Sequence, residues 1–185
     1  MDEYIDIVTE TGEPTGKRAL KSEAHKNGWF HNTTHVWLYT LQGEILLSQR
    51  SASKKIFPLL WDVSAAGHVD AGESVIDAAI RETFEELGFS LVEADLFSVG
   101  VHRHLSTYDE GSIKDYEFHH AYIAELKSPA SDLRLQIGEV ESVKLVSFDE
   151  FRSLLNKSIN NGHFVSSNSA YYEFILKCIR DAIKN

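Results

Sequence analysis

The most constraining feature of this 185-residue chain is a segment in which three glutamates follow a glycine-punctuated loop. Ser74 is followed three residues later by Asp77, a pattern typical of a helix N-cap, and Gly88 is typical of the residue just beyond a helix C-terminus. These signals predict a helix over residues 75–87. Its apolar positions share one face, which we expect to pack on a core: Ile76, Ala79, Ile80, Thr83, Phe84 and Leu87.

Glu82, Glu85 and Glu86 fall on the other side of the predicted helix. Like charges at this spacing cost a helix about 0.2–0.5 kcal/mol per pair, so a bound cation would relieve the arrangement. Carboxylate oxygens suit Mg²⁺ or Mn²⁺, which proteins commonly hold together with substrate phosphates. For the three glutamates taken alone, a solvated acidic face is the commoner explanation.

The whole segment resembles the Nudix box, G-x5-E-x7-R-E-U-x-E-E-x-G-U, in which U is aliphatic. Its fixed polar and glycine positions are Gly67, Glu73, Arg81, Glu82, Glu85, Glu86 and Gly88. Thr83 and Phe89 occupy the aliphatic positions, a departure that concerns packing rather than chemistry. The resemblance implies an α/β/α sandwich with a mixed β-sheet and a metal-dependent hydrolase. It also implies that the glutamates and the Gly67 carbonyl bind Mg²⁺ or Mn²⁺.

The composition limits the class of partner. The chain has 28 acidic and 18 basic residues and a formal net charge of −10, which argues against a nucleic acid polymer because such a partner requires a basic surface. A single cysteine excludes an internal disulfide. The sequence has neither an N-terminal signal pattern nor an apolar run of membrane-spanning length. We therefore expect a cytoplasmic protein that binds a small diphosphate and no membrane; Nudix relatives are often homodimers.

The remaining sequence predicts one domain, 1–185, in which strands and helices alternate. Residues 1–28 form an N-terminal extension with a strand and a turn, 67–89 the box, and 148–185 the C-terminal helices. Strands are predicted at 3–8, 35–41, 44–50, 60–65, 91–98, 100–105, 116–126 and 141–146, and helices at 148–157 and 169–183. A mixed sheet with helices on both faces accounts for this order.

A second resemblance, over residues 30–150, is to the isopentenyl-diphosphate isomerase branch of the Nudix superfamily. It is carried by the run from Arg50 to Trp61, which contains Lys54 and Lys55, and by Ser64-Ala-Ala-Gly-His68. The resemblance implies that Arg50, Lys54 and Lys55 meet a diphosphate. It also implies a second metal site, with His25 nearby, formed by His31, His68, Asp115 and Glu117.

Two departures from the isomerases determine the predicted reaction. Ala66 stands where those enzymes have a catalytic cysteine, and an alanine cannot transfer a proton to or from an alkene. The isomerases keep only the equivalent of Glu86 among the helix glutamates, whereas all three are present here. We therefore predict a hydrolase that cleaves a diphosphate linkage in a small metabolite such as a nucleoside diphosphate derivative. The alternatives are an isomerase-like enzyme and a non-catalytic nucleotide-binding domain.

Within this hypothesis, Glu82 and Glu86 hold the metal, and the general base is Glu85 or Glu117, with a slight preference for Glu117. Arg81 is expected to hold the glutamates in place, by pairing with Glu73 or Glu85, rather than to touch substrate. His68 is a candidate phosphate or metal ligand. The other histidines are less determined: His102, His104, His119 and His120 remain open, and His25 and His163 are expected at the surface. Four aromatic residues are candidates for stacking on a base, although core positions are commoner for such residues: Trp29, Phe30, Trp37 and Trp61.

Overall fold

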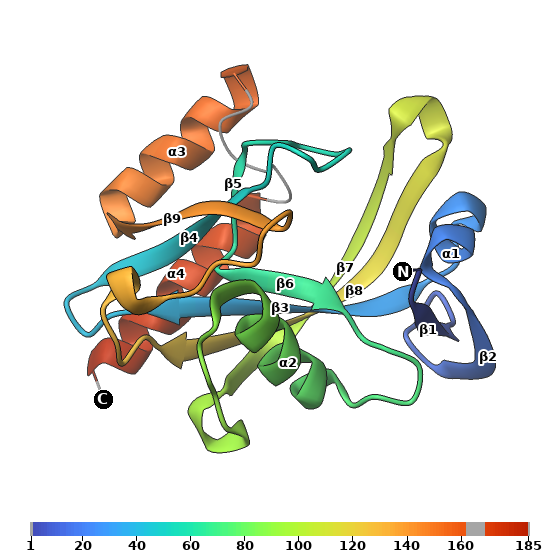
Figure 1. The fold of residues 1–185 in the computed structure, drawn as a ribbon, viewed down its shortest axis with the longest axis horizontal. Coiled ribbons are helices and arrows are strands. Elements are labelled where there is room, and N and C mark those ends of the chain that lie inside the picture. The colour runs from blue at the N-terminus through green and yellow to red at the C-terminus, as the bar shows by residue number, and fades with distance from the viewer. Residues whose placement is uncertain (1, 162–168, 185) are drawn as a thin grey trace.

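The computed structural model describes residues 2–161 and 169–184, which form a mixed sheet with helices on both faces (Figure 1). The strands are β1 (Tyr4–Val8), β2 (Pro14–Leu20), β3 (His31–Tyr39), β4 (Glu44–Arg50), β5 (Trp61–Asp62), β6 (Ala65–His68), β7 (Phe97–Tyr108), β8 (Ile113–Glu125) and β9 (Val140–Ser147). The helices are α1 (Lys21–Asn27), α2 (Val75–Leu87), α3 (Phe148–Asn161) and α4 (Ser169–Lys184). The predicted fold class is therefore confirmed.

Strand β3 lies at the centre of the sheet and brings distant segments of the chain together. It runs parallel to β8, with His31 opposite Glu117 and Tyr39 opposite Glu125. Part of its other edge pairs antiparallel with β6, where Thr33 is opposite His68. The loop that precedes the glutamate helix is thus fixed against the central strand.

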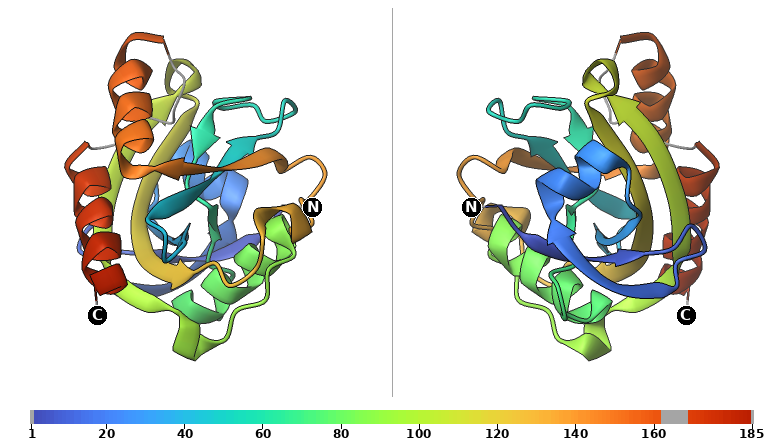
Figure 2. Two further views of the ribbon diagram at one scale, coloured as in Figure 1. Left: turned by 90° about the vertical axis from the view of Figure 1, so that its left-hand side faces the viewer. Right: turned by 90° about the vertical axis from the view of Figure 1, so that its right-hand side faces the viewer.

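The two faces of the sheet bury separate apolar clusters, as expected from the alternation of side chains along a strand. Trp37 of β3 packs with Phe151 of α3 and Ile175 of α4, whereas Val36 and its neighbours pack beneath α2 with Leu87. Figure 2 shows α3 and α4 on one side of the sheet and α2 on the other. The α/β/α layering follows from these two apolar faces.

Helix α2 has the predicted bounds and the predicted caps. The hydroxyl of Ser74 accepts a hydrogen bond from the backbone N–H of Asp77, and Gly88 ends the helix in the left-handed conformation, with φ 64°. Leu87 is fully buried, as expected. The expected burial of Phe84 is wrong, because its side chain is 57% exposed, and Ala78 is buried instead.

Other boundaries differ from the sequence predictions where local patterns were weak. The turn predicted at residues 11–16 is shorter than expected, because β2 begins at Pro14, and neither β2 nor α1 was predicted. The two strands predicted at 91–98 and 100–105 are one continuous strand, β7, which starts at Phe97 and has an irregularity in pairing at Gly100. None of the described helices is both long enough and apolar enough to span a membrane.

Candidate active site

A cavity of about 460 Å³ lies beside β3, β6 and β8, and α1, α2 and α4 also contribute to its wall. Two longer segments complete it: the connection from β4 to β5, and the hairpin of β7 and β8. Phe57 of the first segment contacts Tyr108 of the second edge to face, with ring centroids 5.2 Å apart. The cavity is therefore lined by parts of the chain that are distant in sequence.

The glutamates of α2 reach this cavity beside β6. Gly67 has no side chain, and the Glu82 carboxylate occupies the space that a side chain would fill. A Cβ at Gly67 would lie 2.0 Å from the Cδ of Glu82. Glu86 accepts a 3.2 Å hydrogen bond from the backbone N–H of Ala66. Burial, reinforced by the charge of Glu82, raises the pKa of Glu86 to about 8. Burial also raises the pKa of Glu82, although Arg81 opposes it. Two carboxylates are thus held close together in a partly desolvated place.

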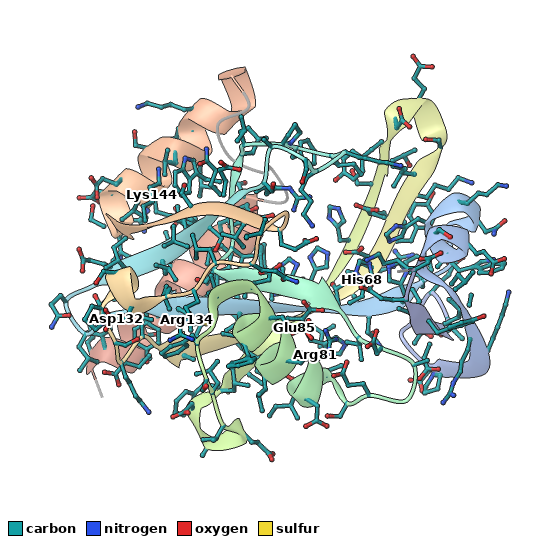
Figure 3. The ribbon with its side chains drawn as sticks, viewed as in Figure 1. His68, Arg81, Glu85, Asp132, Arg134 and Lys144 are labelled. Carbon is teal, nitrogen blue, oxygen red and sulfur yellow. The ribbon has the colours of Figure 1, made fainter. Side chains whose placement is uncertain are left out.

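Arg81 connects the loop before α2 to these glutamates. Its guanidinium donates two hydrogen bonds to Glu73, through Nε at 2.9 Å and Nη2 at 2.8 Å. Nη1 donates to Glu82 at 2.8 Å and to Glu85 at 3.2 Å, and Nη2 also donates to the carbonyl of His68 at 2.9 Å. Figure 3 shows Arg81 and Glu85 on α2, with His68 at the end of β6. Arg81 is not part of the cavity wall, and the pairing predicted for it, with Glu73 or Glu85, is made with both residues.

A second group of possible metal ligands lies close by and consists of His25, His31, His68 and Glu117; one ligand atom from each lies within 4.8 Å of the others. The Nε2 of His25 is 3.2 Å from the Nε2 of both His31 and His68. The Oε1 of Glu117 is 3.4–3.7 Å from the same three nitrogens. These four residues, which we call the histidine group, can hold a metal ion because the ligand atoms converge.

The surroundings of the histidine group orient its ligands. The Nδ1–H of His31 donates to the carbonyl of Trp29 at 2.9 Å, which leaves the Nε2 lone pair directed at the group. Burial lowers the pKa of His68 to about 4, despite its contact with Glu117. Although burial opposes it, the hydrogen bond from His119, together with the nearby imidazole of His25, holds the pKa of Glu117 well below its usual range. Neutral imidazole and ionised carboxylate are the forms that bind metals.

Comparison with known proteins identifies the family. The NUDIX domain model matches residues 29–167. The chain belongs to the Nudix family. It is 34% identical over 160 residues to Nudix hydrolase 3 of Arabidopsis thaliana, a match that covers 84% of this chain but only 21% of that protein. It is 30% identical over 159 residues to isopentenyl-diphosphate Delta-isomerase 2 of Photorhabdus laumondii, covering 85% of each. By its domain and its relatives the chain is a Nudix hydrolase.

The fold of this Nudix hydrolase also has a solved counterpart. The crystal structure of DR0079 from Deinococcus radiodurans matches 95% of this chain and 99% of its own, with a TM-score of 0.68 and 19% sequence identity. Identity at that level supports the fold alone. The isomerase-like branch indicated by the sequence is supported separately, by the Photorhabdus relative.

The basic residues predicted to meet a diphosphate all lie on the wall of the Nudix cavity. Arg50 donates to the carbonyl of Ile56 at 3.1 Å and to Asp62 at 3.2 Å, so it also holds the β4–β5 connection in shape. Lys54 forms an ion pair with Glu139. Lys55 lies on the same wall. All three line the same cavity as the glutamates of α2.

The structure alters the role of several predicted residues. His25 is not a surface residue: its side chain is 18% exposed and belongs to the histidine group. Asp115 lines the cavity, with Oδ1 3.9 Å from the Nε2 of His25, at the margin of that group. His163 lies outside the described residues. The cavity wall includes His104 and His119 and omits His102 and His120.

None of the four aromatic residues proposed for base stacking lines the cavity. Trp37 and Phe30 are buried in apolar clusters, and lysine ammonium groups cover the rings of Trp29 and Trp61. The aromatic residues of the wall are Phe57, Tyr108 and Tyr172, together with five histidines: His25, His35, His68, His104 and His119.

Sequence reasoning also missed cavity residues on β3, although a signal for them existed. Thr33 and His35 follow His31 at alternate positions, and alternate residues of a strand share a face. If His31 belongs to a site, the alternation of side chains along the strand predicts that Thr33 and His35 lie on the same face as His31. Glu3 and Lys21 from the N-terminal extension line the cavity as well, and no local pattern indicates this.

Proposed function

We propose that this Nudix hydrolase uses a divalent metal ion to cleave a diphosphate linkage in a small metabolite. The preferred candidate substrate is a nucleoside diphosphate derivative. The observation that carries the proposal is the placement of Glu82 and Glu86 in one cavity with the basic wall of Arg50, Lys54 and Lys55. In the reaction, the oxygen of a water molecule bonds to one phosphorus. The bond from that phosphorus to the bridging oxygen breaks, this oxygen leaves with the other phosphoryl group, and the general base takes one proton from the attacking water.

The glutamates fit Mg²⁺ or Mn²⁺. The Glu86 carboxylate is buried beside that of Glu82, and Gly67 provides the space for the Glu82 carboxylate. Two neighbouring carboxylates are stabilised when a cation neutralises their charge. We assign Glu82 and Glu86 as metal ligands, with the Gly67 carbonyl completing the set. A bound ion at this position would polarise the phosphoryl oxygens and offset charge on the leaving oxygen.

The histidine group supports a second metal ion. Its imidazole nitrogens favour Mn²⁺ or Zn²⁺ over Mg²⁺, because imidazole is a softer ligand than oxygen. We assign His31, His68 and Glu117 to this ion, with His25 in place of a more distant Asp115.

Glu85 is the better candidate for the general base. One oxygen of Glu117 receives the Nε2–H of His119 at 2.9 Å, and the other faces three histidines. Glu85 lines the cavity, is half exposed, and uses one oxygen to contact Arg81. Its second oxygen can orient and deprotonate water. Arg81 then acts in catalysis by positioning Glu82 and Glu85.

The test is cleavage of a panel of diphosphates with Mg²⁺ or Mn²⁺, for the wild type and for Glu86→Gln, followed by chromatographic separation of the phosphomonoester products and of any inorganic phosphate. The panel contains nucleoside diphosphates and triphosphates, nucleotide sugars, dinucleotides and isopentenyl diphosphate. We expect cleavage that requires metal and falls at least 100-fold in the variant. Glu85→Gln and Glu117→Gln distinguish the base, since its loss lowers kcat more than it raises KM.

Two outcomes of the same assay favour the alternatives. Conversion of isopentenyl diphosphate to its isomer without phosphate release would restore the isomerase, despite Ala66 in the cavity wall. Binding of metal and nucleotide with no turnover of any panel member would indicate a non-catalytic domain.

A further inference from the structure

The carboxylate of the histidine group has a partner outside that group. The Oε1 of Glu117 lies 3.4–3.7 Å from the Nε2 atoms of the three histidines of the group. Its Oε2 lies 2.9 Å from the Nε2 of His119. Glu117 and His119 are both buried, and they alternate along β8, so their side chains leave the same face of the strand. The two oxygens of Glu117 are thus divided between the histidine group and His119.

The hydrogen bond between Glu117 and His119 has one direction when the site holds a metal ion. A carboxylate that binds a metal is ionised and can only accept hydrogen bonds. The Nε2 of His119 then carries the proton and donates it to Oε2. Hydrogen bonds to a charged group are about twice as strong as those between neutral groups. This bond therefore holds the carboxylate with Oε1 toward the histidines.

The ring of His119 is itself held in a row of rings. It stacks on His35 of β3, with centroids 4.1 Å apart, and on His104 of β7, with centroids 4.9 Å apart. Because β8 lies between β3 and β7, the row crosses the sheet. The hydroxyl of Tyr171 lies 3.1 Å from Nδ1 of His35 and accepts the indole N–H of Trp37 at 2.9 Å. The row is thereby anchored to the core, which restricts rotation of the His119 ring away from its carboxylate partner.

We propose that His119 is a positioning residue for the histidine group: by donating to Oε2 of Glu117, it directs Oε1 at the three histidines and raises the affinity of the group for a metal ion. The proposal rests on the second metal ion of the proposed function and gives that ion a further determinant. Partners that orient a ligating side chain in this way are commonly worth about 10–100-fold in metal affinity. A ring that only filled the space between His35 and His104 would not need a hydrogen-bond donor.

Two substitutions at His119 separate hydrogen bonding from packing. His119→Gln removes the ring but keeps an N–H as many bonds from the backbone as the imidazole Nε2–H, so it can still donate to Glu117. His119→Phe keeps a flat ring in the row and removes the donor. His120→Phe is the matched control. His120 is the next residue of β8, faces the opposite side of the sheet, pairs through Nε2 with Asn32 at 3.0 Å, and is not part of the cavity wall.

The experiment titrates the metal-free proteins with Co²⁺, whose visible absorption changes when imidazole nitrogens enter its coordination shell. We expect the wild type to show this absorption and His68→Ala to lose it, which assigns the signal to the histidine group. His119→Phe should weaken Co²⁺ binding about 10–100-fold, whereas His119→Gln and His120→Phe should stay within about threefold of the wild type. Thermal unfolding of the metal-free proteins checks that each variant is folded at the temperature of the titration. His119→Leu, which also lacks a donor, replaces His119→Phe if that variant does not fold.

The proposal is overturned if His119→Phe binds Co²⁺ as well as the wild type does, because the ring alone would then be sufficient. It is also overturned if His119→Gln or His120→Phe loses as much affinity as His119→Phe. If the wild type shows no such absorption, or His68→Ala keeps it, the second metal ion of the proposed function fails and the positioning role fails with it. Diphosphate cleavage that depends on Glu86 is measured separately, so these failures are distinguishable from failure of the proposed hydrolysis.

Discussion

Replacing Gly67 with alanine should abolish most activity without unfolding the protein. A Cβ at this position would lie 2.0 Å from the Cδ of Glu82 and 2.1 and 2.4 Å from its two oxygens. Carbon atoms in contact are normally about 3.5–4.0 Å apart, so the carboxylate must withdraw by about 1.5 Å. A displacement of about 1 Å at a catalytic group costs on the order of 100-fold in rate. We therefore expect kcat/KM to fall at least 100-fold, together with the affinity for Mn²⁺.

The free energy of unfolding should change little in Gly67→Ala, because the atoms that must move are the end of a flexible side chain. A displaced side-chain torsion costs about 0.5–1.5 kcal/mol. The backbone of Gly67 is not left-handed, so alanine also recovers about 0.4–1 kcal/mol by restricting the unfolded chain. These terms nearly cancel, and the midpoint of thermal unfolding should stay within a few degrees of the wild type.

Gly43→Ala is the matched control for this prediction. Gly43 lies in the turn between β3 and β4, away from the cavity, with no atom within 4 Å of the added Cβ and a φ of +84°. Alanine there should lower stability by about 1–2 kcal/mol through backbone strain and leave kcat/KM unchanged. The reasoning is refuted if Gly67→Ala keeps its activity within threefold, or if its activity and stability collapse together.

Three further changes test the same structure. Arg81→Lys keeps the charge but loses the paired contact with Glu73, so kcat should fall at least tenfold and the thermal midpoint should drop; an unchanged kcat would remove Arg81 from the positioning role. In metal-free protein, burial raises the pKa of Glu86 from 4.5 to about 8, so the folded state binds a proton there more tightly than the unfolded state does. The resulting stabilisation is fully present below pH 4.5 and is progressively lost as the pH rises through 8. Thermal melts between pH 5 and 9 should show this decline in the wild type and a smaller one in Glu86→Gln; identical slopes would contradict it. Tyr171→Phe leaves the buried N–H of Trp37 unpaired and should cost about 1–3 kcal/mol in urea denaturation, whereas a neutral result would show that the indole finds another acceptor.

The glutamate helix was predictable because the signals that define it are local. Ser74, Gly88 and the spacing of the glutamates all lie within about four turns, and capping and periodicity act over that range. Within the same helix, the burial of Phe84 was not predictable. Whether an apolar residue at the margin of a stripe is covered depends on what the rest of the chain places against it, and here Phe84 stays 57% exposed.

The histidine group was only partly predictable because it depends on pairing between distant strands. Glu117 meets His31 because β8 runs parallel to β3 in one particular register, and a shift of one residue would turn Glu117 to the other face. His25 is brought to the same place by α1, a seven-residue helix in which Ala24 is the buried position. A helix this short has almost no intrinsic stability, so its existence depends on tertiary contacts that no local pattern reveals.

Strand β6 explains why the glutamates of α2 and the histidine group, the two proposed metal sites, must respond to each other. Its last three residues serve different purposes: the N–H of Ala66 binds Glu86, Gly67 makes room for Glu82, and His68 joins the histidine group. Arg81 also holds the carbonyl of His68, so any movement of the strand shifts the glutamates and the imidazole together. Residues that share one backbone segment and one hydrogen-bond network seldom contribute independently. Loss of Glu82 and loss of His68 should consequently combine to less than the sum of their separate effects on catalysis, because either change already disturbs the strand on which the other depends.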